Sequence, residues 1–313
     1  MAGTLIVSLD FELFWGMHDC STLEKYGPNI LGGRKAIPQM LDLFCKYGIH
    51  ATWASVGMLF ANSPQELHPY LPQRKPSYLH AALSPYPFLS HIPDGDPHYF
   101  APKLLEQISQ TPGQEIGSHS FCHYYCREEG QSPEDFYDDM RAALSIGKDK
   151  GYALKSVVLP RNQSEPDYID VLRELGYTSY RDEENDWIHE KVRFRPLMRL
   201  LRLADVYLPL TGQGCFLPKN ENGIVNIVGS RMYKPRFIGL LEPLKLRRIK
   251  KQMLHAAKHD LCFHLWWHPH NIGVNTAYHL KQLEVIFSYY KWLQTTYDMR
   301  SLNMGELAEE VLH

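Results

Sequence analysis

The chain alternates short apolar runs with longer amphipathic segments, and this alternation restricts the folds that it can adopt. Residues 5–9 read Leu-Ile-Val-Ser-Leu, and strand-like runs recur at 50–56, 114–118, 155–159, 177–180 and 261–267. Continuous apolar runs are typical of parallel strands that are buried on both faces. Helical spacing marks the segments 33–48, 102–109, 133–150, 165–175, 243–259 and 276–294. The sequence therefore predicts βα repeats around a parallel sheet or barrel.

Two segments interrupt this alternation. Residues 62–102 hold nine of the 21 prolines, and residues 185–240 show only short strand-like runs near 223–228. No linker-like composition divides the chain elsewhere. We therefore expect one domain over residues 1–313, with irregular insertions at about 62–102 and 185–240.

Composition excludes several classes of protein. The formal net charge of -2 argues against nucleic-acid binding, and no apolar run is long enough to predict a transmembrane helix. The chain enters its first strand almost at once, which leaves no room for a cleavable signal. Six cysteines in 313 residues do not form a disulfide framework. The expected location is the cytoplasm.

Polar side chains follow four of the predicted strands at the point where each strand ends. They are Asp10 with Glu12, His119 with His123, the run Arg161-Asn162-Gln163, and the run His268-Pro269-His270-Asn271. In parallel βα folds, the residues that perform chemistry lie at the carboxyl ends of the strands. The four clusters are therefore expected to meet at one site.

The two histidines four residues apart point to a metal ion. The sequence predicts a strand that runs into a helix here, and on a helix His119 and His123 would share one face. A catalytic site of this kind needs a third ligand, commonly a carboxylate, and an open position for water. Asp10 and Glu12 are the best donors. The sequence therefore indicates a mononuclear metal hydrolase.

These segments resemble a known family. The order Ser-Leu-Asp-Phe-Glu, His-Ser-Phe-Cys-His, Pro-Arg-Asn-Gln and Trp-Trp-His-Pro-His-Asn is similar to the polysaccharide deacetylases of the NodB-homology class, carbohydrate esterase family four. The resemblance covers roughly residues 4–181 and 260–272. It implies a distorted (β/α) barrel of about seven parallel strands that binds one divalent metal ion. It also implies removal of N-acetyl groups from amino sugars, free, carrier-linked or in a polysaccharide.

The resemblance also implies roles for single residues. His119, His123 and Glu12 would bind the metal, and Asp10 would be the catalytic base, although Asp10 and Glu12 remain exchangeable. The metal is expected to be zinc, with cobalt, nickel, manganese and iron as alternatives. Phe11 separates the two acids, which are adjacent in the commonest family motif.

Two further roles complete the expected mechanism. Arg161 would orient the base, and His268 would be the general acid, with His264 and His270 as rivals. The motif Pro160-Arg161-Asn162-Gln163 resembles the branch of the family associated with surface-polysaccharide biosynthesis.

Four alternatives remain open. A structural zinc site could use His119, Cys122, His123 and Cys126, which would share one stripe of a helix. A non-haem iron oxygenase also uses two histidines and a carboxylate. A non-catalytic sugar-binding protein could keep the same scaffold. A metal-dependent C–N hydrolase could act on a small non-sugar amide or cyclic ureide.

A basic segment suggests what else the protein contacts. Residues 191–251 carry 14 Lys or Arg and only three acidic residues, Asp205, Glu221 and Glu242. Such a segment could lie on an anionic membrane surface or bind the phosphates of a lipid- or nucleotide-linked sugar. An ordinary solvated helix face is the alternative. Trp187, in a loop among acidic residues, is a candidate for stacking on a sugar ring.

Overall fold

Strand β1 (Thr4–Phe11) is an interior strand of the sheet, and its mostly apolar run is fully buried. The computed structural model describes residues 2–183, 188, 194–235 and 239–313. Strand β1 pairs in parallel with β2 (Ala51–Ser55) on one side and β9 (Cys262–Trp267) on the other. Strand β10 (Arg300–Leu302) pairs with its first residues.

The described strands form one ten-stranded sheet. Its order is β6-β7-β5-β4-β3-β2-β1-β9-β8, with β10 beside β1. The remaining strands are β3 (Gln114–Ser118), β4 (Ser156–Val158), β5 (Ser179–Arg181), β6 (Lys219–Glu221), β7 (Ile224–Asn226) and β8 (Arg231–Met232). Only the β6–β7 pair is antiparallel among these ladders. The carboxyl ends of the parallel strands therefore meet at one edge.

The predicted α/β fold with a parallel sheet is confirmed. The sheet ends at β6 and β8, and no ladder among the described residues joins these two strands. The hydrogen bonds therefore do not close a barrel.

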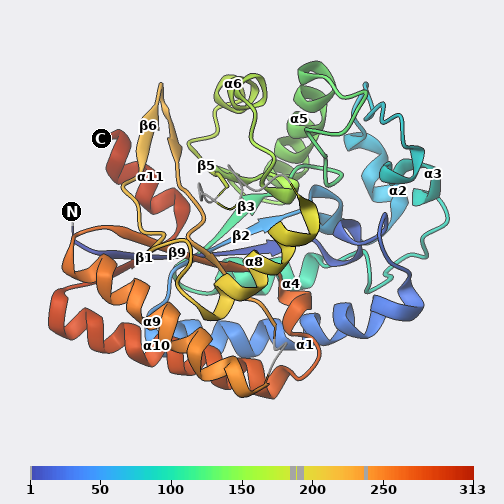
Figure 1. The fold of residues 1–313 in the computed structure, drawn as a ribbon. Coiled ribbons are helices and arrows are strands. Elements are labelled where there is room, and N and C mark those ends of the chain that lie inside the picture. Colours follow the sequence, from blue (N-terminus) through green and yellow to red (C-terminus); the bar gives the residue numbers. More distant parts are fainter. Residues whose placement is uncertain (1, 184–187, 189–193, 236–238) are drawn as a thin grey trace.

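Helices surround the curved sheet (Figure 1). The α-helices are α1 (Leu23–Tyr47), α2 (Pro64–Leu67), α3 (Tyr86–Leu89), α4 (Pro102–Gln110), α5 (Pro133–Asp149), α6 (Pro166–Glu174), α8 (Arg195–Tyr207), α9 (Glu242–Lys258), α10 (Thr276–Tyr297) and α11 (Met304–Leu312). Helices α1, α9 and α10 form one layer below the sheet, while α5 and α6 lie above it. Each of these helices buries apolar residues against the core, as its helical pattern predicts.

Short 3₁₀ helices connect the strands to these helices. They are η1 (Leu13–Gly16), η2 (Gly57–Phe60), η3 (His68–Tyr70), η4 (Ala81–Leu83), η5 (Pro160–Asn162), η6 (Gly239–Leu241) and η7 (Pro269–Ile272). Four of them, η1, η2, η5 and η7, follow strands β1, β2, β4 and β9 after one intervening residue. They turn the chain at the strand ends and so hold the polar residues found there.

The two predicted insertions differ in structure. Residues 62–102 contain only short helices, in keeping with their prolines. Residues 194–235 contain α8, but they also supply β7 and β8, which pair in parallel with β5 and β9. The second segment is thus less irregular than its sequence indicates, because strands of two or three residues are too short to give a period.

Two properties of the chain bear on its surroundings. All six cysteines are free thiols. Among the described residues, no helix has the length and apolar character needed to cross a bilayer.

Candidate metal centre and active site

Two acidic side chains lie at the carboxyl end of β1. Asp10 is in the strand and Glu12 immediately follows it, so their spacing of two directs them to the same side. Both are 4% exposed. A Cβ atom at Gly16 would lie only 2.1 Å from Cδ of Glu12, so this glycine leaves room for the carboxylate. Gly16 is a site residue that the motif analysis missed.

The two histidines do not lie on a helix, so that prediction was wrong. His119 follows β3, and the chain then turns through left-handed residues at Ser120 (φ 60°) and His123 (φ 64°). The carboxylate of Asp139 in α5 accepts the backbone N–H groups of Phe121 at 2.7 Å and Cys122 at 3.2 Å. These bonds hold an irregular loop, and the loop brings the two imidazoles together.

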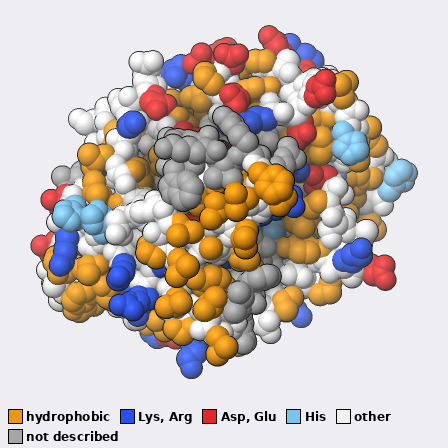
Figure 2. All heavy atoms as spheres, viewed as in Figure 1, with side chains coloured by type: hydrophobic (Ala, Val, Ile, Leu, Met, Phe, Trp, Pro, Cys, Tyr) orange, Lys and Arg blue, Asp and Glu red, His pale blue; other side chains and the backbone are white. Residues whose placement is uncertain are grey.

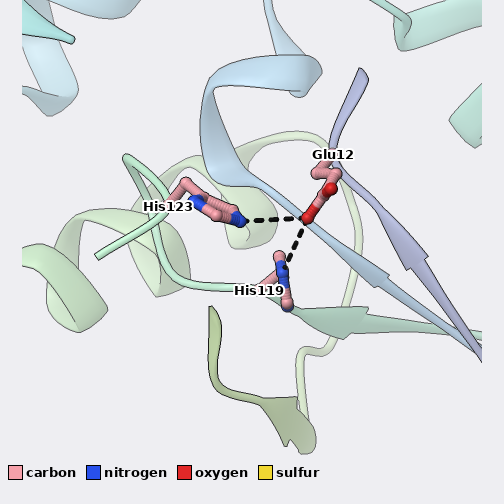
Figure 3. A group of neighbouring side chains, drawn as sticks. All are labelled: Glu12, His119 and His123. Carbon is pink, nitrogen blue, oxygen red and sulfur yellow. Dashed lines mark hydrogen bonds and ion pairs between the residues drawn. The ribbon is translucent and has the colours of Figure 1, made fainter. Parts of the chain in front are cut away.

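Glu12 and the two histidines converge on one point (Figure 3). Oε2 of Glu12 lies 3.2 Å from Nε2 of His119 and 2.9 Å from Nε2 of His123. The three side chains are buried, and their donor atoms lie within 4.8 Å of one another. In the described part of the chain, they are the one group of three such side chains with this geometry.

This donor set fits a divalent metal ion. Nδ1 of His119 lies 2.7 Å from the carbonyl oxygen of Val158 and donates its proton there, so the lone pair of Nε2 faces Glu12. Burial lowers the pKa of His123 and favours its neutral form. The lone pair of His119 that faces the carboxylate repels it unless a cation lies between them. Ligands bonded at about 2.1 Å to a tetrahedral ion lie about 3.4 Å apart, close to the observed separations.

Asp10 is held by Arg181 rather than by Arg161, which corrects the sequence-based assignment. Nη1 and Nη2 of Arg181 each donate to one carboxylate oxygen of Asp10, both at 2.7 Å. Arg181 ends β5, is fully buried and stacks on Trp266 at 4.1 Å. Asn162 accepts from Nε of the same guanidinium at 3.0 Å. The strand-end rule could have found Arg181, because it follows the predicted strand 177–180.

Arg161 instead lies at the rim of the site. It binds the carboxylates of Asp19 at 2.6 Å and Glu128 at 2.7 Å, and its guanidinium lies 4.0 Å from the ring centroid of Tyr125. Its backbone is left-handed (φ 57°) in the turn after β4. Arg161 is therefore paired with these two carboxylates and the aromatic ring instead of with Asp10.

His268 faces both acids. Its Nε2 lies 3.5 Å from Oδ2 of Asp10 and 3.7 Å from Oε1 of Glu12. Tyr26 donates to Oδ1 of Asn271, and Nδ2 of Asn271 lies 3.3 Å from Nδ1 of His268. These contacts orient the imidazole so that Nε2 points toward the acids.

The two rival histidines have different surroundings. His264 is fully buried and lies 2.8 Å from the hydroxyl of Ser8. It does not line the cavity that opens onto Asp10 and Glu12. His270 lines the cavity, with Nε2 at 3.8 Å from Oε1 of Glu12. Burial lowers the pKa of each to about 3. Both are therefore neutral near pH 7.

Both carboxyl groups are ionised at neutral pH. Burial would raise the pKa of Asp10, but the attraction of Arg181 and His268 outweighs it and lowers this pKa. Burial opposes ionisation of Glu12 in the same way, and His268 and His123 lower its pKa well below the usual value. The two acids thus remain charged in a buried site for different reasons.

A cavity of about 340 Å³ leads to these groups. Its wall includes Asp10, Glu12, His123, Arg161, Trp266 and His268. A volume of this size lies within the range of small-molecule sites. Trp187, the proposed sugar-stacking residue, lies outside the described residues.

The structural zinc site is not supported by the geometry. It required His119, Cys122, His123 and Cys126 on one helical stripe, and this segment is not helical. Within the described ranges, the group that could hold a metal contains Glu12 and no cysteine.

Comparisons with known proteins concern the family and the fold of the chain. Residues 26–180 match the family model described as polysaccharide deacetylase. No curated protein matches the chain by sequence. Two solved structures with such names have similar folds, at 90% coverage of each. One, from Mycobacterium smegmatis and only provisionally named a polysaccharide deacetylase, gives a TM-score of 0.63 at 11% identity over 99% of this chain. The other, a probable polysaccharide deacetylase from Pseudomonas aeruginosa PAO1, gives 0.60 at 13% over 98%.

The fold extends to another enzyme. The structure of Puue allantoinase gives a TM-score of 0.61 at 13% identity, over 98% of this chain and 90% of that one. At such low identity, these structural neighbours establish the fold alone.

Proposed function

We propose that the protein is a metal-dependent hydrolase that removes the N-acetyl group of an amino sugar, because residues 26–180 match the family model described as polysaccharide deacetylase. One observation carries the proposal. A buried carboxylate and two imidazoles converge beside a second carboxylate and a histidine at the edge of one cavity. This is the combination that amide hydrolysis needs: a cation site, a base and an acid.

Glu12, His119 and His123 would hold the metal. The distances from Oε2 of Glu12 to the two imidazoles support Glu12 as the ligand, while the two bonds from Arg181 support Asp10 as the base. A bound zinc or similar ion would lower the pKa of its water and polarise the acetyl carbonyl.

The chain's own groups would move the protons. Asp10 accepts a proton from the attacking water, since Arg181 keeps its carboxylate ionised and fixes both oxygens. His268 in its doubly protonated form then donates the Nε2 proton to the departing amine and is left as neutral imidazole. Its 20% exposure places this nitrogen where a substrate can reach it.

Bound metal per chain is the decisive measurement. We expect one ion in the parent protein, and loss of it in Glu12→Gln and His123→Ala. Cys126→Ala is the matched control, because Cys126 is buried near the same loop but absent from the metal group. Equal metal in all four proteins, or loss only in Cys126→Ala, would overturn the proposed centre.

Acetate release from N-acetylated amino sugars then tests the reaction. The alternative substrates, small amides and cyclic ureides such as allantoin, enter the same assay as competitors. Hydrolysis of a ureide without acetate release from any sugar would favour the alternative. Cytoplasmic location remains a prediction, consistent with six free thiols.

A further inference from the structure

The guanidinium of Arg181 has an acceptor for every one of its N–H groups. Nη1 and Nη2 donate to the carboxylate of Asp10, and Oδ1 of Asn162 accepts from Nε at 3.0 Å and from Nη2 at 2.9 Å. The second proton of Nη1 is donated to Oγ of Ser8 at 2.8 Å. These bonds use the full donor capacity of an arginine. Because the guanidinium is planar, Asn162 and Ser8 fix it on either side of Asp10.

The hydroxyl of Ser8 connects this guanidinium to His264. An arginine only donates, so Oγ of Ser8 accepts the bond from Nη1, and the proton of the hydroxyl needs a separate acceptor. Nε2 of His264 lies 2.8 Å from Oγ of Ser8. His264 is neutral near pH 7, because burial lowers its pKa to about 3. The hydrogen bonds therefore assign the lone pair of His264 to Nε2 and its proton to Nδ1.

The bonds from His264 through Ser8 and Arg181 to Asp10 run through the interior of the protein. His264, Ser8 and Arg181 are fully buried. The ladder between β1 and β9 sets their positions, since it pairs His264 with Ile6, two residues before Ser8. Side chains two residues apart share one face of a strand, so Ser8 and Asp10 follow Ile6 toward the site. Solvent does not replace a bond that is lost here.

His264 and Ser8 do not line the site cavity. An effect of His264 on the reaction therefore has to pass through Arg181. Trp266 stacks on the guanidinium at 4.1 Å and restrains its tilt, which leaves rotation within its plane to Asn162 and Ser8. The direction of the bond from Arg181 to Asp10 thus depends on the acceptor that Ser8 supplies.

We propose that His264 is a positioning residue that acts through Ser8 and Arg181 on the base, Asp10. The lone pair of His264 fixes the direction of the Ser8 hydroxyl, so that its oxygen faces Nη1 of Arg181. The guanidinium then presents both oxygens of Asp10 in one orientation to the attacking water. This inference rests on the proposed hydrolase function, and it gives His264 a role other than that of the general acid.

Two replacements of His264 separate this hydrogen bond from the presence of the ring. Glutamine places its amide near the position of Nε2 and can supply an acceptor to Ser8, whereas the shorter asparagine reaches only the position of Nδ1. We expect kcat for acetate release to fall about 10–100-fold in His264→Asn, as it does for other outer partners of catalytic groups. KM should stay near the parent value, because His264 does not line the site cavity. His264→Gln should restore kcat toward the parent value.

NMR of the Arg181 guanidinium tests the same bonds without any substrate. Protein labelled with nitrogen-15 arginine gives the rate at which the two protons of Nη1 exchange by rotation, and Arg181→Lys identifies the signal. We expect slow exchange in the parent and in His264→Gln. In His264→Asn and in Ser8→Ala it should be at least about tenfold faster, as the loss of one hydrogen bond to a charged group implies.

An exposed histidine provides the control. Figure 2 shows histidine side chains on the surface of the protein. His259, which follows α9, is exposed, and its ring contacts that of His255. His259→Asn and His259→Gln should leave kcat and the exchange at Arg181 unchanged. Bound metal per chain should equal that of the parent in every variant, because Glu12, His119 and His123 are intact.

The remaining outcomes overturn the inference or the proposed function separately. Equal kcat in His264→Asn and His264→Gln, or exchange at Arg181 that neither His264→Asn nor Ser8→Ala accelerates, would overturn the positioning role and leave the hydrolase standing. A parent protein that hydrolyses no substrate, yet shows the faster exchange in both variants, would refute the hydrolase and retain the hydrogen-bond chain from His264 to Asp10.

Discussion

Replacement of Arg181 by methionine should destabilise the protein strongly. Arg181 is fully buried and makes two bonds of 2.7 Å to Asp10, which is 4% exposed. Arg181→Met removes the cation but keeps most of the side-chain volume, so Asp10 is left as an unpaired buried charge. Breaking a buried pair in this way costs about 3–5 kcal/mol. We expect a loss of that size in the free energy of unfolding.

A surface pair of the same geometry provides the control. Arg300 makes two bonds of 2.8 Å to Glu310, but these side chains are 37% and 38% exposed. Exposed pairs of this kind contribute about 0.2–1 kcal/mol. Urea unfolding of Arg181→Met and Arg300→Met at pH 7 compares the two directly, with equal m-values as the condition for the comparison.

A double variant identifies the cause of the loss. Asp10→Asn removes the buried charge, so Arg181→Met/Asp10→Asn should be more stable than Arg181→Met alone. If Arg181→Met costs no more than Arg300→Met, or if Asp10→Asn fails to restore stability, the pair does not act as a buried ion pair and the reasoning is refuted.

Three further changes have outcomes that the structure predicts. His268→Ala should keep the metal and lower acetate release by about 10²–10⁴-fold, because it removes only the acid; unchanged turnover would remove His268 from the mechanism. Asp139→Ala leaves the buried backbone N–H groups of Phe121 and Cys122 without their acceptor, which costs about 1–3 kcal/mol of stability for each. Both the free energy of unfolding and the metal content should therefore fall, and normal metal content would contradict this. The pKa of His264 is about 3 in the folded protein and about 6.5 in the unfolded chain. Below pH 6.5 the unfolded chain therefore takes up a proton at His264 that the folded protein does not, and the free energy of unfolding decreases as the pH falls. Between pH 7 and 5, urea unfolding should therefore show about 2 kcal/mol less loss in His264→Asn than in the parent, and equal losses would refute the shift.

The sheet and the location of the site were predictable from the sequence. Buried strands leave a strong apolar signal, as in β1, and parallel strands must end at a common edge. Asp10, Glu12, His119, His123 and His268 follow strands in the sequence, and the structure brings them together. Their convergence depends on topology and hardly on loop detail.

The finer geometry could not be read from the sequence. The i, i+4 spacing of His119 and His123 predicted a helix, but a carboxylate twenty residues from His119, Asp139, binds the loop backbone instead. Arg161 and Arg181 both follow strands, and only the folded structure shows which of them reaches Asp10. Which arginine binds Asp10, and which group binds the loop backbone, depends on competition between residues far apart in the sequence. Hydrophobic periodicity carries no information about that competition.

The surroundings of the two acids also explain how residues two positions apart can differ in role. Asp10 has a permanent cation in Arg181, so its charge is balanced by the protein itself. Oε2 of Glu12 faces Nε2 of His119 and of His123, and the former has its other ring proton committed to Val158. A buried carboxylate among neutral imidazoles still requires positive charge. This asymmetry is the physical argument for assigning the metal to Glu12 and the base to Asp10. It predicts that removal of the metal raises the free-energy cost of the ionised carboxylate far more at Glu12 than at Asp10.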